Sequence, residues 1–192
     1  MQITLLQWIE LISALLGILG VWLNTKSNIM GWPIGIVSVI LAALVYFQSR
    51  LFAEFGLQIF YAFSGLYGWW KWIKVLDRNR SEISSISTFK LLMSLLLGLI
   101  LTVLIGYWLK FNTQADFPWI DSALAAFSLI AQVWLAQKYI ENWLLWMVIN
   151  LVSIGLYSVK ELWFFLGFFL ALFVLSFFGY FNWKKKWRKE SY

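Results

Sequence analysis

Two short rows of polar and aromatic residues have spacings that place each row on one face of a helix. Within each row the residues follow one another at intervals of three or four, as side chains on a shared helical face do. The rows are Gln58, Tyr61 and Ser64, and Trp143, Trp146 and Asn150. Indole and phenol rings stack on flat or cationic rings, and Asn and Gln amides hydrogen-bond their polar substituents. We therefore predict that these six residues bind a polar, flat heterocycle.

The residue types that the chain lacks exclude several kinds of chemistry. There is no cysteine and no histidine, so thiolate catalysis, disulfides and the commonest metal and haem ligand are all missing. No carboxylate lies deep in a predicted span, which disfavours a membrane enzyme that works by general acid–base catalysis. We expect no catalytic residue, no metal site and no cofactor, and a cation would be held by aromatic faces and dipoles.

Each candidate also has a purely structural explanation. Trp143 lies near a helix end, where tryptophan often joins the interfacial aromatic belt, and a hydrogen bond between two helices would by itself explain Asn150. Glu10 and Asp121 leave three roles open: an outer half-gate, a proton site or a partner of the helix dipole. Belt or packing roles are expected for Trp8, Trp69, Trp70, Trp72, Trp119, Trp163, Trp183 and Trp187.

The helices that must position these residues follow from the composition. The 192 residues are 62% hydrophobic, 20% aromatic and only 12% charged, whereas a soluble domain is about half apolar and about a quarter charged. Runs such as 91–101 and 164–178 are apolar on every face, unlike the alternating strands of a membrane barrel. The sequence thus predicts an all-α integral membrane protein with seven transmembrane helices, at 4–24, 29–48, 52–74, 88–110, 118–137, 142–159 and 161–183.

The basic residues predict how the chain is oriented. The net charge is +6, and the lysines and arginines cluster at helix ends, which favours membrane topology over a nucleic-acid partner. With the N-terminus outside, the inner loops and the tail would hold 12 of the 15 basic residues. The positive-inside rule therefore predicts an outer N-terminus and an inner C-terminus.

The chain also contains an internal repeat at an offset of about 111 to 115 residues. The order of the matches is conserved over three consecutive spans: Trp8 and Glu10 return as Trp119 and Asp121, Asn28 and Trp32 as Asn142 and Trp146, and Gly68 and Trp72 as Gly179 and Trp183. Because one span separates the copies, both copies point the same way. Parallel repeats of this kind occur in SWEET carriers, where substrate binds near the midplane between rocking halves.

These observations divide the chain into four parts. They are a first three-helix repeat at 1–75, a cytoplasmic loop and linker helix 4 at 76–117, a second three-helix repeat at 118–183 and a basic cytoplasmic tail at 184–192. The loop near 75–88 is expected to be mobile. The two polar rows lie on the last helix of one repeat and the middle helix of the other, so we expect them to face a common cavity.

The segment KYIENWLLW at 138–146, with Asn150, Ser153 and Tyr157, resembles the signature of the PnuC family of vitamin transporters. Gln58-Ile59-Phe60 followed by Tyr67-Gly68-Trp69 resembles that family's third-helix motif. The resemblance implies a SWEET-like 3+1+3 fold and a homotrimer in the bacterial cytoplasmic membrane. It also implies facilitated diffusion of a vitamin that a cytoplasmic kinase then traps by phosphorylation. The positions it assigns to substrate contact are Trp143, Trp146, Asn150 and Gln58.

The resemblance leaves two vitamins open. Family members specific for nicotinamide riboside often have an N-terminal extension, and an Asn where this chain has Ser64. This chain begins almost directly at its first span, which is more similar to the thiamine-carrying branch, PnuT. Thiamine is therefore the expected substrate and nicotinamide riboside the alternative. More remote readings are a membrane enzyme and a scaffold subunit, and the only other expected partner is membrane lipid.

Overall fold

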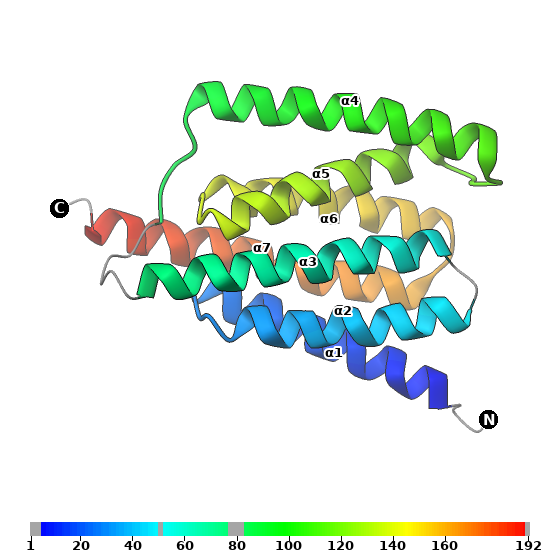
Figure 1. The fold of residues 1–192 in the computed structure, drawn as a ribbon, viewed down its shortest axis with the longest axis horizontal. Helices are drawn as coiled ribbons and strands as arrows, with labels where there is room; N and C mark the ends of the chain where they lie inside the picture. Colours follow the sequence, from blue (N-terminus) through cyan, green and yellow to red (C-terminus); the bar gives the residue numbers. More distant parts are fainter. Residues whose placement is uncertain (1–4, 50–51, 77–82, 191–192) are drawn as a thin grey trace.

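The computed structural model describes residues 5–49, 52–76 and 83–190, and these form seven helices (Figure 1). Their ends agree with the predicted spans to within a few residues, except that the last helix continues seven residues beyond the predicted end at 183. The helices are α1 (Leu5–Thr25), α2 (Gly31–Gln48), α3 (Phe52–Leu76), α4 (Thr88–Asn112), α5 (Pro118–Ala136), α6 (Glu141–Val159) and α7 (Trp163–Glu190).

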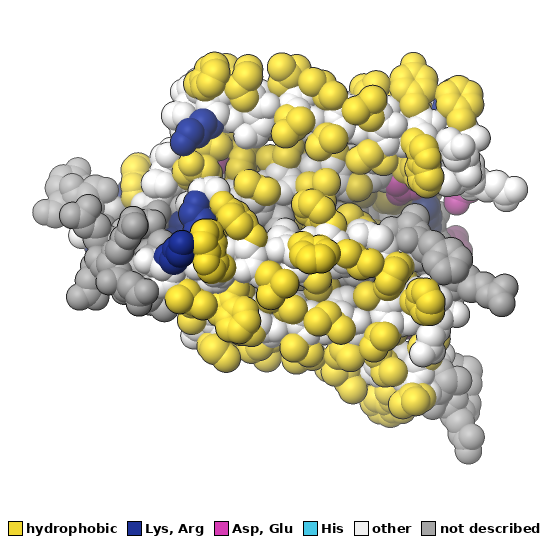
Figure 2. All heavy atoms as spheres, viewed as in Figure 1, with side chains coloured by type: hydrophobic (Ala, Val, Ile, Leu, Met, Phe, Trp, Pro, Cys, Tyr) yellow, Lys and Arg dark blue, Asp and Glu magenta, His cyan; other side chains and the backbone are white. Residues whose placement is uncertain are grey.

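The described helices form a multi-pass membrane protein. All except α3 are long and apolar enough to cross a bilayer, and α3 is the helix that carries the row of Gln58, Tyr61 and Ser64. Apolar side chains cover most of the face shown in Figure 2, with lysine or arginine side chains gathered towards the end where α3 ends and α4 begins. The exposed apolar surface is the surface that lipid would cover.

Six of the helices close into a ring. Among the described residues, the packed pairs are α1 with α2, α2 with α3, α3 with α5, α5 with α6, α6 with α7, and α7 with α1. The two pairs that join the halves, α3 with α5 and α7 with α1, each bring the first helix of one predicted repeat against the third helix of the other. This reciprocal arrangement is the one expected if the two three-helix segments are copies of one unit.

Helix α4 lies outside the ring and packs only on α5 within the described part of the chain (Figure 1). Two glycines allow this close approach, since a Cβ at Gly98 would meet Phe127 and one at Gly106 would meet Trp119. The Trp134 indole N–H also donates to the Ser94 hydroxyl at 3.3 Å. Helix α4 is therefore attached to the second half of the protein.

The segment before α4 is held in place, although we expected a mobile loop near 75–88. The Ser84 N–H donates to the Lys138 carbonyl at 3.1 Å, and the Ile140 N–H donates to the Ser84 carbonyl at 3.0 Å. The Glu141 carboxylate accepts from the Ile86 N–H at 3.0 Å. These bonds tie 83–87 to the turn between α5 and α6, while 77–82 lie outside the described residues.

The turns that begin α2 and α6 fix the register between the two halves. Ser27 and Lys138 have positive φ angles of 56° and 58°, and the surrounding backbone hydrogen bonds recur at an offset of 111. The predicted pairing of Asn28 and Trp32 with Asn142 and Trp146 is therefore wrong by three residues: Asn28 corresponds to Tyr139 and Trp32 to Trp143. The error arose because the second half offers two tryptophans within one helical turn.

We expect Gly179→Ala to destabilise the protein, because the added Cβ would overlap the ring of Trp143. Overpacking of this kind costs about 1–3 kcal/mol, and thermal unfolding of the purified protein in detergent would measure the loss. Gly167→Ala on the same helix is the matched control, because a Cβ there meets no atom within 4 Å. Equal melting temperatures for the two variants would contradict the packing described.

Candidate functional site

Four buried tryptophans form a continuous chain of ring contacts that crosses the inside of the helical ring, from one half of the protein to the other. Trp32 meets Trp72 edge-on with ring centroids 5.5 Å apart, and Trp143 meets Trp183 edge-on at the same 5.5 Å. Trp72 and Trp183 meet each other at 6.0 Å and join the two pairs. Because α3 and α7 do not pack directly on each other within the described part of the chain, these two side chains bridge the space between them. We call Trp32, Trp72, Trp143 and Trp183 the tryptophan plug.

The plug is positioned by the same device in each half. Gly68 lies four residues before Trp72, and the ring of Trp32 packs where a side chain at Gly68 would be. In the same way, Gly179 lies four residues before Trp183, and the ring of Trp143 packs against it. The Trp183 indole N–H donates to the Asn24 carbonyl at 3.0 Å. The plug therefore lies at the end of the ring where α1 and α5 end and α2 and α6 begin.

A positive charge also contacts the plug. The Lys138 ammonium, on the turn between α5 and α6, lies 4.8 Å from the centroid of the Trp72 ring. A cation over an indole face contributes about 0.5–1 kcal/mol at an exposed site and more when it is desolvated. Lys138 thus connects the second half of the protein to a ring that belongs to the first half.

The row on α6 is directed mainly towards α7. Trp143 is 1% exposed and belongs to the plug, and Trp146 is half-buried against the same cluster. Asn150 is also 1% exposed, and its Nδ2 donates to the Ser176 hydroxyl of α7 at 3.2 Å. The three residues form one buried polar and aromatic face, as the spacing predicted.

The row on α3 is directed at least in part towards α5. Gln58, Tyr61 and Ser64 are all half-buried. The Tyr61 hydroxyl hydrogen-bonds the Ser128 side chain of α5, whereas the Ser64 hydroxyl donates to the Tyr61 carbonyl of its own helix at 3.0 Å. Helices α3 and α6 do not pack on each other within the described residues. The common cavity between the rows therefore stays a prediction.

Several polar atoms in this region are buried and have no hydrogen-bond partner among the described residues. They include Oδ1 of Asn150 and the indole N–H groups of Trp32, Trp72 and Trp143. A buried polar group without a partner costs about 1–3 kcal/mol, so such groups favour a bound polar ligand. Asn150 offers an acceptor and Trp143 a donor, two turns apart on one face of α6.

Sequence reasoning assigned Trp72 and Trp183 to belt or packing roles and missed that they fill the centre of the ring. The available signal was a glycine four residues before a tryptophan, in both α3 and α7. It also missed Ser128 and Ser176, which are 6% and 2% exposed and contact the predicted rows. A serine within an apolar helix gives no sign of its neighbours until the helices are packed.

The acidic pair lies near helix starts. Glu10 is in the second turn of α1 and Asp121 in the first turn of α5, and both are half-buried. A carboxylate in the first turn interacts favourably with the helix dipole. The position of Asp121 therefore suits the role of a helix-dipole partner, the simplest of the three roles left open.

Comparison with known proteins places this arrangement in a known group. Residues 7–185 match the family described as nicotinamide mononucleotide transporter. The chain is similar to the nicotinamide riboside transporter PnuC of Escherichia coli, with 28% identity over 81% of this chain and 76% of that protein. It is also 28% identical to the PnuC of Neisseria mucosa, over 96% of this chain and 74% of the relative.

A solved structure shares the fold. It is titled as the crystal structure of the vitamin B3 transporter PnuC, and it matches with a TM-score of 0.77 at 25% identity. The match covers 95% of this chain and 83% of that chain. The ring of helices described above is therefore a fold that a transporter adopts.

The hydrogen bonding of the plug predicts different costs for two equivalent substitutions. Trp183→Phe removes an indole N–H that is bonded to Asn24, whereas Trp143→Phe removes one without a partner among the described residues. We expect the first variant to lose about 1 kcal/mol more stability than the second in the absence of ligand. Thermal unfolding of both purified variants measures this difference. A loss for Trp143→Phe as large as that for Trp183→Phe would refute the assignment.

Proposed function

The chain belongs to the family of nicotinamide mononucleotide transporters that includes the PnuC proteins, and we propose that it carries nicotinamide riboside across the membrane by facilitated diffusion. The observation that carries the proposal is the buried face of Trp143, Trp146 and Asn150, which presents aromatic rings together with an indole N–H and an amide oxygen without partners among the described residues. Gln58, Tyr61 and Ser64 are proposed to complete the binding site from α3.

The chemistry of this face suits a pyridinium nucleoside. Indole rings stack on a flat cationic ring and stabilise its charge through their electron-rich faces. The Asn150 oxygen can accept a hydrogen bond from an amide or a sugar hydroxyl. The positive charge then needs no buried carboxylate, consistent with the positions of Glu10 and Asp121 near helix ends.

Nicotinamide riboside replaces thiamine as the preferred substrate. The expectation of thiamine rested on Ser64, which belongs to the proposed site, and on the short segment before the first span. The named relatives are nicotinamide riboside transporters, and the similarity covers about three quarters of their length. Both vitamins are cationic heterocycles, so thiamine is kept as the alternative in the same site.

The tryptophan plug is proposed to be the gate at one end of the pathway. It closes the ring where the two halves meet, and its central contact joins Trp72 of one half to Trp183 of the other. Rocking of the halves would break this contact and open the end. The distribution of lysines and arginines supports placing this end in the cytoplasm, where phosphorylation of the arriving vitamin would drive net uptake.

A homotrimer in the bacterial inner membrane completes the proposal. Helix α4 packs only on α5 within the described part of the chain, so most of its apolar surface is free for lipid or neighbouring subunits. The resemblance to PnuC proteins favours neighbouring subunits for part of this surface. Light scattering of the purified protein would measure the mass of the assembly.

Titration of the purified protein with nicotinamide riboside tests the site. We expect binding to quench tryptophan fluorescence, and Asn150→Ala to weaken it about tenfold through the loss of one hydrogen bond. Trp146→Ala should weaken it further because stacking is lost. Asn112→Ala and Trp108→Ala are the matched controls, since both residues lie on the exposed face of α4.

The same titration with thiamine discriminates the substrates. Tighter binding of thiamine than of nicotinamide riboside would favour the alternative. Binding of neither compound, or binding that the Asn150 and Trp146 variants leave unchanged, would contradict the proposed site.

Cross-linking tests the proposed gate. The chain has no cysteine, so Trp72→Cys combined with Trp183→Cys provides the only two thiols. We expect a short thiol-specific cross-linker to abolish vitamin uptake into proteoliposomes, and a reducible linker to restore it after reduction. Each single variant treated with the same reagent is the control. Full uptake by the cross-linked protein would show that the plug does not gate the pathway.

A further inference from the structure

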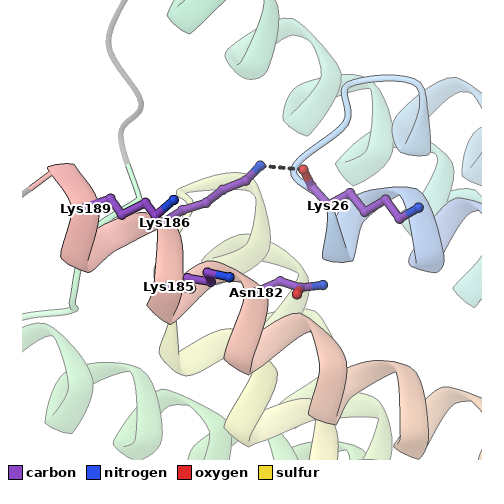
Figure 3. Close-up of a pocket in the computed structure, with 5 residues that line it drawn as sticks. All are labelled: Lys26, Asn182, Lys185, Lys186 and Lys189. Carbon is purple, nitrogen blue, oxygen red and sulfur yellow. Dashed lines mark hydrogen bonds between the residues drawn. The ribbon is translucent and has the colours of Figure 1, made fainter.

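A basic pocket lies outside the proposed transport pathway, between the end of α7 and the turn that joins α1 to α2. It has a volume of about 310 Å³ and is lined by four lysines and an asparagine, with no acidic residue among them (Figure 3). The lining residues are Lys26, Asn182, Lys185, Lys186 and Lys189. We call it the lysine pocket.

The helical spacing of α7 builds one wall of this pocket. Asn182, Lys185, Lys186 and Lys189 follow at i, i+3, i+4 and i+7, so they share one face of the helix. This face exists because α7 continues to Glu190 instead of ending with its apolar run. The two other basic residues of this stretch, Lys184 and Arg188, do not line the pocket.

A hydrogen bond joins the two walls of this open pocket. The Lys186 ammonium donates to the Lys26 carbonyl at 2.6 Å, as Figure 3 shows, and so fixes the end of α7 against the turn. The Lys26 ammonium lies over the Trp22 ring at 3.5 Å. Lys185 and Lys189 are exposed. Four lysine side chains therefore line a hollow that has no carboxylate among its lining residues to balance them.

The equivalent position lies where the end of α3 meets the turn between α5 and α6, and there the protein side chains bond to one another. At the offset of 111, Lys26 corresponds to Gln137 and Asn182 to Lys71. There the Lys71 ammonium donates to the Gln137 side-chain oxygen, and the Gln137 amide donates to the Tyr67 hydroxyl at 3.0 Å. The polar groups of the Lys71 and Gln137 site are thus hydrogen-bonded to each other, whereas the lysine pocket is lined by like charges. Uncompensated like charges favour an anion.

We propose that the lysine pocket binds a phosphate-bearing anion, the shared chemistry of an anionic lipid headgroup and of soluble phosphate. Lysine clusters beside the end of a membrane helix attract anionic lipids. The exposed rings of Trp22, Phe178 and Phe181 lie on the adjoining helices and offer contacts for acyl chains. The pocket is a site for regulation or anchoring by the membrane, and it is independent of the transported vitamin.

The proposal is tested with the purified protein in detergent. Phosphatidylglycerol, phosphatidylcholine and inorganic phosphate are added separately, while retained lipid is counted by native mass spectrometry and the melting temperature is followed. We expect phosphatidylglycerol to be retained and to raise the melting temperature, and phosphatidylcholine to do neither. The double variant Lys185→Ala, Lys189→Ala should weaken phosphatidylglycerol binding about thirtyfold, at about 1 kcal/mol per lysine.

The double variant Lys184→Ala, Arg188→Ala is the matched control, because it removes the same charge from the same turns of α7 but from other faces. It should retain the lipid. Stabilisation by inorganic phosphate that disappears only in the Lys185 and Lys189 variant would support the site with soluble phosphate as its ligand. Binding of neither anion, or equal losses in the two double variants, would overturn the proposal.

Discussion

Packing of tryptophan rings against glycine is the interaction on which the rest of the structure depends. Gly68 and Gly179 let Trp32 and Trp143 lie against the neighbouring helix backbones, and these rings in turn hold Trp72 and Trp183 in the centre of the ring. In a bilayer, helices gain little from burying apolar surface, so close packing and hydrogen bonds must hold them together. The large indole rings provide contact area between α3 and α7, which do not pack on each other among the residues that the structure describes.

This packing also connects the proposed site to the proposed gate. Trp143 contacts Trp183 in the plug and shares a helical face with Asn150, so one residue belongs to both. A ligand that orients Trp143 would change its contact with Trp183, and through Trp183 the contact with Trp72 of the other half. A sub-ångström shift of Trp143 at the ligand could then favour or disfavour the contact between Trp72 and Trp183. Small shifts can have such effects because packed interfaces switch between separate arrangements.

The sequence predicted the membrane class and the helix boundaries well, because long apolar runs and short polar turns have few alternative structures. It predicted that Trp143, Trp146 and Asn150 share a face for the same reason. It did not resolve the register between the halves, since both Trp143 and Trp146 lie within the offset of 111 to 115 residues from Trp32. Nor did it distinguish Trp72 and Trp183 from belt residues, because burial depends on which glycine packs opposite. The attachment of 83–87 to a distant turn was not predicted either, because two of its bonds use backbone groups common to every residue and the Glu141 carboxylate has no partner near it in the sequence.

That attachment makes the two halves mechanically unequal. Residues 83–87 are bound to the turn between α5 and α6, and α4 is packed on α5, so the linker helix is attached to the second half and the two together contain four helices. The first half is a lighter three-helix body. If the subunits assemble through α4, the helices α4 to α7 would stay fixed in the assembly. Helices α1 to α3 would then be the part that moves. Each subunit could then open and close its pathway without moving its neighbours, so the subunits of the assembly would transport independently of one another.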